Sequence, residues 1–344
     1  MSIVSCKPTI TRKELESVLD CLISEKLESG DIIKSFESQV SELTGLKYAL
    51  ATNSLTSAYH LAFIALDLKP GDEVLLPSYF DPAPLNALRL MGALPVLVDI
   101  DENALIPSVG QVREKITTAT KALVLGHTFG FMVPMAEYRE LGVPLIEDIS
   151  HVIGAEYEEK SAGQDGLITI ASFAPSMMIT TGNGGVVLTN NSRHFSSMRD
   201  SRSSSGPIPS FDYTMTDFQG AMGVSQLSRL QDFIRRRRDI ARVYHEVLKN
   251  TPHRTIYAFS DGFVYQSFPI LFDASAEKTE KFWKKSGIEV IHPCAVPLHQ
   301  HLGLRGMDYP NSDRMSKKLY ALPVYPTLSK KEIEKIAKTL AKFI

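Results

Sequence analysis

The sequence predicts an α/β protein with a mostly parallel central sheet, followed by a smaller α/β domain at the C-terminus. Short apolar runs alternate with helix-like segments through about the first two thirds of the 344 residues. This alternation favours right-handed crossovers and a sheet that is covered on both faces. After about Arg235 the pattern changes to a long helix and shorter strands. We therefore place a large domain at residues 1–235 and a small domain at residues 236–344.

The elements of the large domain follow one another at short intervals. A short apolar run at residues 48–51 precedes a helix at residues 56–66. The turn at residues 70–72, Pro-Gly-Asp, then leads into the next strand, and a second helix covers residues 84–91. The predicted strands are residues 48–51, 73–77, 95–99, 122–126 and 145–148.

Polar residues gather just after these strands. In a parallel sheet, ligands bind beyond the carboxyl ends of the strands. The segments to inspect are therefore residues 53–56, 78–81, 127–128 and 148–151. The Ser-rich residues 201–205, with Gly206 and Pro207, predict a loop that lies over such a site.

The C-terminal third reads as a smaller α/β unit. A helix at residues 219–248 is expected to carry the chain out of the large domain. Its basic run, residues 235–238, predicts a solvated helix face rather than a phosphate-binding patch. Strands are predicted at residues 264–272 and 288–291, and an amphipathic helix at residues 330–343 with Ser329 as its N-cap.

Composition excludes several classes of function. The 37 basic and 39 acidic residues nearly cancel, so no global field recruits nucleic acid or an anionic membrane. No apolar run reaches the roughly 18 residues of a membrane helix, and residues 1–13 have no apolar core, so we expect no signal peptide there. Cys6, Cys21 and Cys294 show no metal-ligand spacing. We expect a cytoplasmic protein without a metal site.

Short motifs recur along the chain in one order and spacing. From about residue 30 onwards they resemble the DegT/DnrJ/EryC1/StrS family of sugar aminotransferases. The matching segments are residues 36–37, 69–74, 92–96 with Asp99, 147–148, 154–155, 172–173, 180–182, 184–185, 226–227, 297–299 and 322–326.

The resemblance implies a fold-type-I, pyridoxal-phosphate-transferase-like protein. It implies a homodimer with active sites at the subunit interface, and pyridoxal phosphate or pyridoxamine phosphate as cofactor. In the family, an amino group passes from an amino acid, usually glutamate, onto a keto sugar nucleotide. By the same resemblance, His299, in the Pro-Leu-His segment, lies near the sugar.

Such chemistry requires an acid beside the pyridine nitrogen and a lysine that holds the cofactor as a Schiff base. Asp148 ends a predicted buried strand and matches the position of the acid; the alternative is a carboxylate that caps the next helix. His151 falls where the family often has a polar residue near the ring. It is either a candidate base or a hydrogen-bonded core histidine.

The implied phosphate site departs from the family pattern. Ser54, Thr56 and Ser172 match hydroxyl-bearing positions, but Leu55 replaces the glycine of the Ser-Gly-Thr turn. Asp81 stands where an aromatic ring cover is expected, and Asp212 replaces an asparagine that reaches the partner subunit's phosphate.

The lysine is the decisive departure. Family members carry it four residues after the phenylalanine that corresponds to Phe173, and Met177 occupies that position here. A thioether neither forms an imine nor carries a proton at neutral pH. No lysine lies between Ser161 and Leu248, and Asn183 replaces a usual glutamate in the glycine-rich turn.

Three functional hypotheses follow. The first is a family member that is degenerate for transamination and binds a nucleotide sugar or pairs with an active paralogue. The second is an enzyme with altered, lysine-independent chemistry, such as sugar dehydration with pyridoxamine phosphate, in which His151 or Asp81 acts as the base. The third is a conventional nucleotide-sugar aminotransferase that uses another lysine, such as Lys160 or a lysine from the other subunit.

Overall fold

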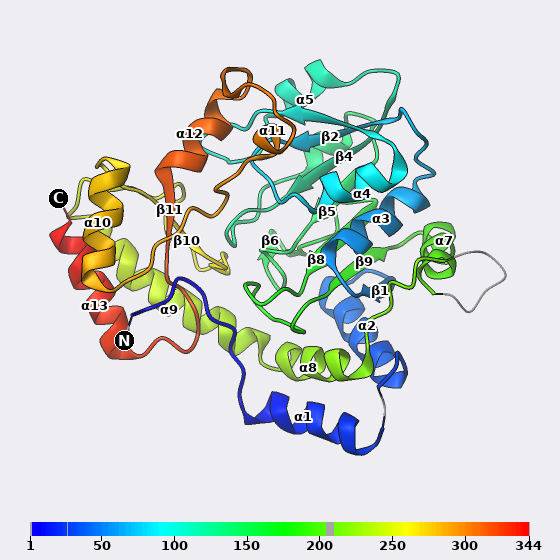
Figure 1. The fold of residues 1–344 in the computed structure, drawn as a ribbon, viewed down its shortest axis with the longest axis horizontal. Helices are drawn as coiled ribbons and strands as arrows, with labels where there is room; N and C mark the ends of the chain where they lie inside the picture. Colours follow the sequence, from blue (N-terminus) through cyan, green and yellow to red (C-terminus); the bar gives the residue numbers. More distant parts are fainter. Residues whose placement is uncertain (1, 26, 204–209, 344) are drawn as a thin grey trace.

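The computed structural model describes residues 2–25, 27–203 and 210–343, and Figure 1 draws its fold. Most of the loop predicted at residues 201–207 lies outside the described residues. The large sheet holds seven strands in the order β1-β9-β8-β5-β4-β2-β3. Its strands are β1 (Tyr48–Thr52), β2 (Glu73–Pro77), β3 (Leu94–Val98), β4 (Thr120–Gly126), β5 (Leu145–Asp148), β8 (Ile168–Ser172) and β9 (Gly185–Thr189).

The sheet is mostly parallel, as predicted. Among the seven strands described, β9 runs in the opposite direction to the other six, so its pairings with β1 and β8 are antiparallel. Residues of β8 and β9 alternate between two cores: Ile168, Ile170 and Val187 face one, whereas Ala171 and Val186 face the other. The sheet is therefore buried on both faces, which explains the near-continuous apolar runs in its strands.

Helices cover both faces of this sheet (Figure 1). Among the described residues the α-helices are α1 (Arg12–Ile23), α2 (Asp31–Thr44), α3 (Leu55–Ala65), α4 (Ala83–Met91), α5 (Val109–Lys115), α6 (Ala136–Arg139), α7 (Ser192–Arg202), α8 (Asp217–Leu227), α9 (Leu230–Leu248), α10 (Ala276–Ser286), α11 (Leu298–His301), α12 (Pro310–Lys318) and α13 (Lys330–Lys342). Gly306–Asp308 form a 3-10 turn. No helix in the described ranges is long and apolar enough to cross a membrane.

A second core lies beside the large sheet. It contains the two-stranded sheet of β10 (Phe268–Leu271) and β11 (Leu319–Leu322), packed against α9, α10 and α13. A small hairpin, β6 (Glu156–Tyr157) and β7 (Lys160–Ser161), follows β5. The expected N-cap of α13 is confirmed, because the Ser329 hydroxyl accepts from the Glu332 backbone and Glu332 bonds back to Ser329.

Helix α9 belongs to both cores. Leu230, Phe233 and Ile234 pack under the large sheet, whereas Ile240 and Tyr244 pack in the second core. The domain boundary predicted after residue 235 thus falls inside a continuous helix. One rigid element links the two cores.

The single long helix predicted at residues 219–248 is wrong. The chain forms α8 and α9 with a break at Ser228 and Arg229, where Arg229 leaves helical geometry (φ −114°, ψ 2°). The Arg229 guanidinium instead donates to Glu14 Oε1 (2.7 Å) and Thr11 Oγ1 (2.9 Å). This tertiary anchor on α1 is not visible in the local sequence pattern.

The basic run in α9 is also not a wholly solvated face. Arg237 is 2% exposed and donates to the carbonyl oxygens of Gln266 (2.8 Å) and Val324 (2.5 Å). Arg238 donates to the Phe263 carbonyl oxygen (2.8 Å). The sequence pattern of this run did not show that the segment containing Phe263 and Gln266 and the segment at Val324 pack against α9.

Two predicted strands are shorter or missing. Residues 264–267 do not join β10, because the backbone amides of Val264 and Ser267 bond to the loop after β4, at Gly130 and Phe129. Residues 288–291 form only isolated bridges, Ile3 with Ile288 and Ile291 with Ala321. In both cases long-range backbone partners override local strand propensity.

The buried Glu14 ties α1 to the break between α8 and α9. Its side chain is 1% exposed and pairs with Arg229. Burial alone would raise the pKa of Glu14, but hydrogen bonds from Thr11 and Arg229 lower it to about 2. A lowered pKa contributes stability that is present above the unfolded value and is lost as the pH falls towards 2.

We therefore predict that Glu14→Gln lowers the free energy of unfolding by about 2–3 kcal/mol at pH 7. The difference from the wild type should shrink as the pH falls from about 5 to about 2. Urea denaturation across this range measures it. Glu16→Gln, which disrupts only the exposed pair with Arg12, is the matched control and should change stability by less than about 0.5 kcal/mol. An equal loss in both variants would contradict the role assigned to Glu14.

Candidate active site

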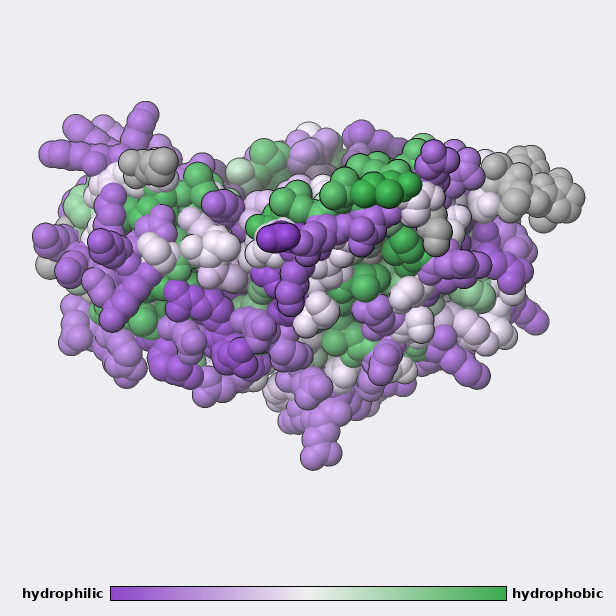
Figure 2. Space-filling model, turned by 90° about the horizontal axis from the view of Figure 1, so that it is seen from below, coloured by the Kyte–Doolittle hydropathy of each residue, from purple (hydrophilic) through white to green (hydrophobic). Residues whose placement is uncertain are grey.

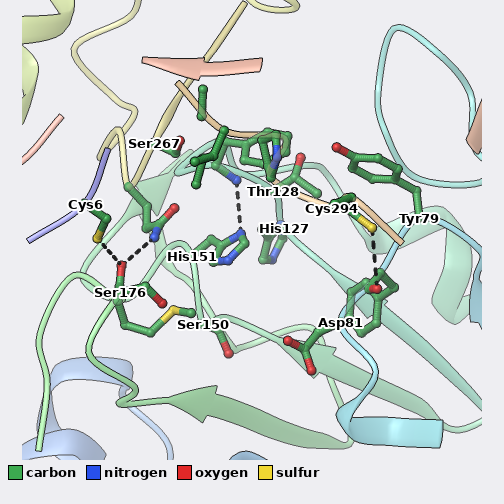
Figure 3. Close-up of a pocket in the computed structure, with 18 of the residues that line it drawn as sticks. Cys6, Tyr79, Asp81, His127, Thr128, Ser150, His151, Ser176, Ser267 and Cys294 are labelled. Carbon is green, nitrogen blue, oxygen red and sulfur yellow. Dashed lines mark hydrogen bonds between the residues drawn. The ribbon is translucent and has the colours of Figure 1, made fainter. Parts of the chain in front are cut away.

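A cavity of about 400 Å³ opens at the carboxyl ends of the parallel strands (Figure 3). This volume lies within the range of small-molecule sites. Loops after β2, β4 and β5 form one side, and segments of the second core, including residues 293–296, form the other. The N-terminal residues Ser5 and Cys6 close one end. The location agrees with the sequence-based expectation.

Asp148 forms the floor of the cavity at the end of β5. Its Oδ2 accepts a hydrogen bond from the Tyr59 hydroxyl (2.5 Å), and its Oδ1 accepts from the Ser150 backbone (2.8 Å). Burial raises the pKa of Asp148, although the bonds from Ser150 and Tyr59 oppose the shift. The Ser150 hydroxyl in turn accepts from the Ser172 backbone on β8 (2.9 Å). The carboxylate is thus held from two elements besides its own strand.

Asp81 lines the same cavity from the loop between β2 and α4. Its Oδ1 accepts from the Ala83 backbone (2.7 Å), and Oδ2 has no hydrogen-bond donor among the described residues. Burial raises the pKa of Asp81, and the charge of Asp148 raises it further, against the opposing Ala83 amide. The neighbouring Phe80 packs on Gly126, where an added Cβ would lie 2.6 Å from the ring, so this glycine permits the loop to approach β4.

His151 lies in the cavity wall as a neutral ring. Its Nδ1 accepts from the Phe129 backbone (3.3 Å), which leaves the proton on Nε2. Burial lowers the pKa of His151 to about 4. If Nδ1 were protonated, its N–H would face the Phe129 backbone N–H, and the hydrogen bond between them would be lost. The geometry therefore favours a hydrogen-bond donor at Nε2 over the base that the sequence analysis considered.

Leu55 and Met177 supply apolar wall at two positions singled out by sequence. Leu55 is the first residue of α3, after the N-cap Ser54. Met177 lies in the loop between β8 and β9, where its backbone bonds to the Ala174 carbonyl oxygen. No lysine or arginine lines the cavity within the described parts of the chain.

Other sequence-predicted positions lie near the cavity without lining it. Ser54 Oγ accepts from the Ser57 backbone, and Ser172 Oγ from the Ala174 backbone. Thr56 is half-buried in the first turn of α3. Asp212 is exposed, with φ of 49°, and its carboxylate accepts from Thr214 (3.2 Å).

His299 also lies outside the cavity lining. The ring is fully buried, its Nδ1 lies 2.8 Å from the Ser78 hydroxyl, and it stacks on Tyr309 at 5.1 Å. This places it behind the end of β2.

Sequence reasoning missed two tyrosines, Tyr59 and Tyr79. Tyr59 is fully buried in an apolar helix, so no periodicity distinguishes its hydroxyl from core packing. Tyr79 follows β2 and lies within a segment marked for inspection, but its residue type alone suggested no role. Only the fold brings the Tyr59 hydroxyl to the Asp148 carboxylate and places Tyr79 in the cavity wall.

A sequence profile of the DegT/DnrJ/EryC1/StrS aminotransferase family matches residues 8–341. The chain belongs to this family. A GDP-perosamine synthase of Escherichia coli O157:H7 is 30% identical over 354 residues, which cover 98% of this chain and 97% of that protein. The family includes proteins of amino-sugar biosynthesis.

Solved structures confirm the fold-type-I architecture of this family member. The aminotransferase TlmJ from Streptoalloteichus hindustanus is 25% identical, with a TM-score of 0.90 over 99% of this chain and 98% of that one. The putative sugar aminotransferase Spr1654 from Streptococcus pneumoniae, in its PMP form, is 22% identical, with a TM-score of 0.93 over 100% and 98% of the two chains. The second likeness concerns the fold alone.

The described side chains that line this cavity do not fit a phosphate-bearing pyridoxal cofactor, although α3 begins in the cavity wall at Leu55 and its first backbone N–H groups are of the kind that binds phosphate. A phosphate dianion requires cationic or N–H donors. The buried carboxylate of Asp148 and the exposed carboxylate of Asp81 face this cavity instead, and the lining residues described include no lysine or arginine to balance them. The described residues also contain no group of three or more His, Cys, Asp or Glu side chains that could hold a metal ion.

We predict that Tyr59→Phe lowers the free energy of unfolding by about 1–3 kcal/mol, because it removes a donor from the buried Asp148 carboxylate. In an Asp148→Asn background the loss should shrink by about 1 kcal/mol, since a neutral acceptor depends less on the hydroxyl. Urea denaturation at pH 7 of the four proteins in this cycle measures the coupling. Equal losses in both backgrounds would show that Tyr59 acts only through packing.

Proposed function

We propose that this chain is a sugar-aminotransferase-family protein that has lost lysine-dependent transamination and binds a nucleotide-linked sugar noncovalently in the cavity. The observation that carries the proposal is the cavity wall at Met177, together with the lack of a lysine among the described lining residues. A Schiff base requires a primary amine within reach of the aldehyde. A methionine thioether supplies neither the amine nor a proton.

Lys7 and Lys160 are the native lysines to consider as a substitute Schiff-base amine, and neither lines the cavity. Lys7 follows the lining residue Cys6, but it is exposed, and its charge acts on Glu332 of α13. Lys160, the candidate substitute, lies on β7 and pairs with Asp165 at 3.7 Å. These contacts give the conventional aminotransferase hypothesis no support within this chain.

The altered-chemistry hypothesis requires a base in the cavity. His151 presents a donor at Nε2, because the Phe129 amide occupies its Nδ1. Asp81 remains as the other candidate, but a pyridoxamine phosphate cofactor would place its phosphate in a cavity with two carboxylates. We therefore prefer noncovalent binding. A nucleotide-linked sugar is the ligand class that the name of the related GDP-perosamine synthase suggests.

A pyridoxal phosphate titration followed by borohydride reduction tests the proposal. We expect no reduced adduct on the wild-type chain after peptide mapping, apart from sparse labelling of exposed lysines. Met177→Lys should acquire a borohydride-stable adduct at position 177, because the new amine then lies in the cavity wall. Met178→Lys is unsuitable as a control because Met178 is buried in the core, so Ser176→Lys, on the adjacent lining residue, provides the comparison.

Either of two results would contradict the proposal. A stoichiometric adduct on one native lysine would restore the conventional aminotransferase hypothesis. An adduct on Ser176→Lys but none on Met177→Lys would mean that position 177 does not correspond to the family's lysine.

We further propose that the chain forms a homodimer through α1. Leu15, Leu19, Leu22 and Ile23 follow helical spacing, and each is at least half exposed. Figure 2 shows hydrophobic side chains gathered along the helix that lies lowest in Figure 1. Contiguous exposed apolar surface of this kind is typical of a subunit interface.

We predict that Leu19→Glu combined with Ile23→Glu converts the dimer to a monomer, because two charges would be buried in the interface. Size-exclusion chromatography with light scattering measures the mass. Arg12→Glu together with Lys13→Glu, on the polar face of the same helix, serves as the control. A double Leu19/Ile23 variant that remains dimeric would place the interface elsewhere. A wild-type chain that is monomeric alone but dimeric with a homologue would favour pairing with an active paralogue.

A further inference from the structure

A row of lysine side chains runs along the exposed face of α13. Its members are Lys331, Lys335, Lys338 and Lys342. Their spacing of three or four residues places them on one stripe of the helix, which is about 16 Å long. This lysine row lines a groove of about 300 Å³, in which Glu334 is the only acidic residue among the described lining residues. The groove shares no described lining residue with the cavity at the strand ends.

The lysine row lacks the ion pairs that lysines of other exposed helices form. Lys317 pairs with Asp313 in α12, and Lys34 pairs with Asp31 in α2. Within the described chain, the four lysines of the row form no ion pair or hydrogen bond. Each has a lysine of the same row three or four residues away, and like charges at these spacings destabilise a helix.

Helix stability does not explain the row. A cation is favourable in the last turn of a helix, where Lys342 lies, but it is unfavourable in the first turn, where Lys331 lies. An anionic partner bound along the stripe would relieve the repulsion over its whole length. The row therefore has the charge pattern of a docking surface.

Helix α10 extends this basic surface. The two helices lie side by side in Figure 1, and the ring of Phe282 in α10 stacks at 4.7 Å on Phe343, the C-cap of α13. Together they hold nine lysines and four glutamates, whereas the whole chain has a net charge of −2. Positive charge is thus concentrated at this end of the molecule, where Figure 2 shows hydrophilic side chains.

The composition of the surface favours a protein partner over a membrane or a nucleic acid. Helix α13 turns Ile333, Ile336 and Leu340 into the core, and no large apolar side chain is exposed among the described residues of the two helices for insertion into a bilayer. Neither helix contains an arginine, the residue best suited to phosphate. No aromatic ring among their described residues is exposed to stack on bases.

We propose that the lysine row is a docking surface for an acidic segment of a partner protein, bound along α13 in an extended conformation. In an extended chain, side chains on alternate residues point the same way and repeat at about 6.6 Å. Successive lysines of the row rise by about 4.5–6 Å along the helix. Carboxylates at alternate positions of the segment therefore meet successive lysines. This surface is separate from the cavity, so the inference does not depend on the proposed function.

Fluorescence anisotropy of the full chain with a labelled peptide of alternating glutamate and glycine tests the proposal. A peptide of the same length with glutamine in place of glutamate carries no side-chain charge. At low salt we expect the acidic peptide to bind at least about tenfold more tightly than the neutral one, because several charge pairs form at once. Most of this preference should be lost at about 1 M salt, where the screening length falls to about 3 Å.

Three double variants locate the binding. Lys335→Glu with Lys338→Glu should abolish the preference, because it reverses the charge at the centre of the row. Lys335→Arg with Lys338→Arg should retain it, since the charge is kept. Lys115→Glu with Lys121→Glu, at exposed positions of α5 and β4, is the matched charge control and should weaken binding by less than about twofold.

Equal binding of the two peptides, binding of neither, or a preference that survives the glutamate substitutions in the row would overturn the proposal. Tighter binding to vesicles of phosphatidylcholine and phosphatidylglycerol, or to single-stranded DNA, would also overturn it, because a lipid surface or a nucleic acid would then be the better partner. If the glutamate variant fails to fold, Lys335→Gln with Lys338→Gln decides, since it removes the charge without reversing it.

Discussion

The buried carboxylate of Asp148 is the constraint on which the site depends. A carboxylate without water is costly unless several donors hold it. The Tyr59 hydroxyl comes from α3 and the Ser150 amide from the turn after β5, and Ser150 also bonds to the backbone of β8. This network fixes the floor of the cavity relative to the sheet. It also sets the negative charge that any ligand meets.

A buried cation fixes the opposite side of the cavity. Arg237 lies within α9, and its guanidinium is held by carbonyl oxygens of Gln266 and Val324, residues that also line the cavity. Burial lowers the pKa of Arg237 to about 10, so the group remains charged at neutral pH. Because α9 also packs under the large sheet, this anchor aligns the second core with the strand ends.

The departures from the family pattern make the cavity less favourable for an anionic group. Asp81 adds a carboxylate to the cavity, and Met177 and Leu55 supply apolar wall where the resemblance implies an amine and a glycine. The added carboxylate of Asp81 disfavours an anionic cofactor by like-charge repulsion. The hydrogen bonds that hold the Asp148 carboxylate are made within the chain.

The sequence by itself determined the α/β class, the parallel strands that end at residues 77 and 148, the family, and the presence of Met177 in the segment after Phe173. These features depend on local periodicity and on motifs of adjacent residues. Only the tertiary structure decided that Tyr59 reaches Asp148, that Arg237 is buried, that His299 lies behind β2, and that α8 and α9 separate at Arg229. Each of these depends on a partner far away in the chain, and local sequence carries no record of such a partner.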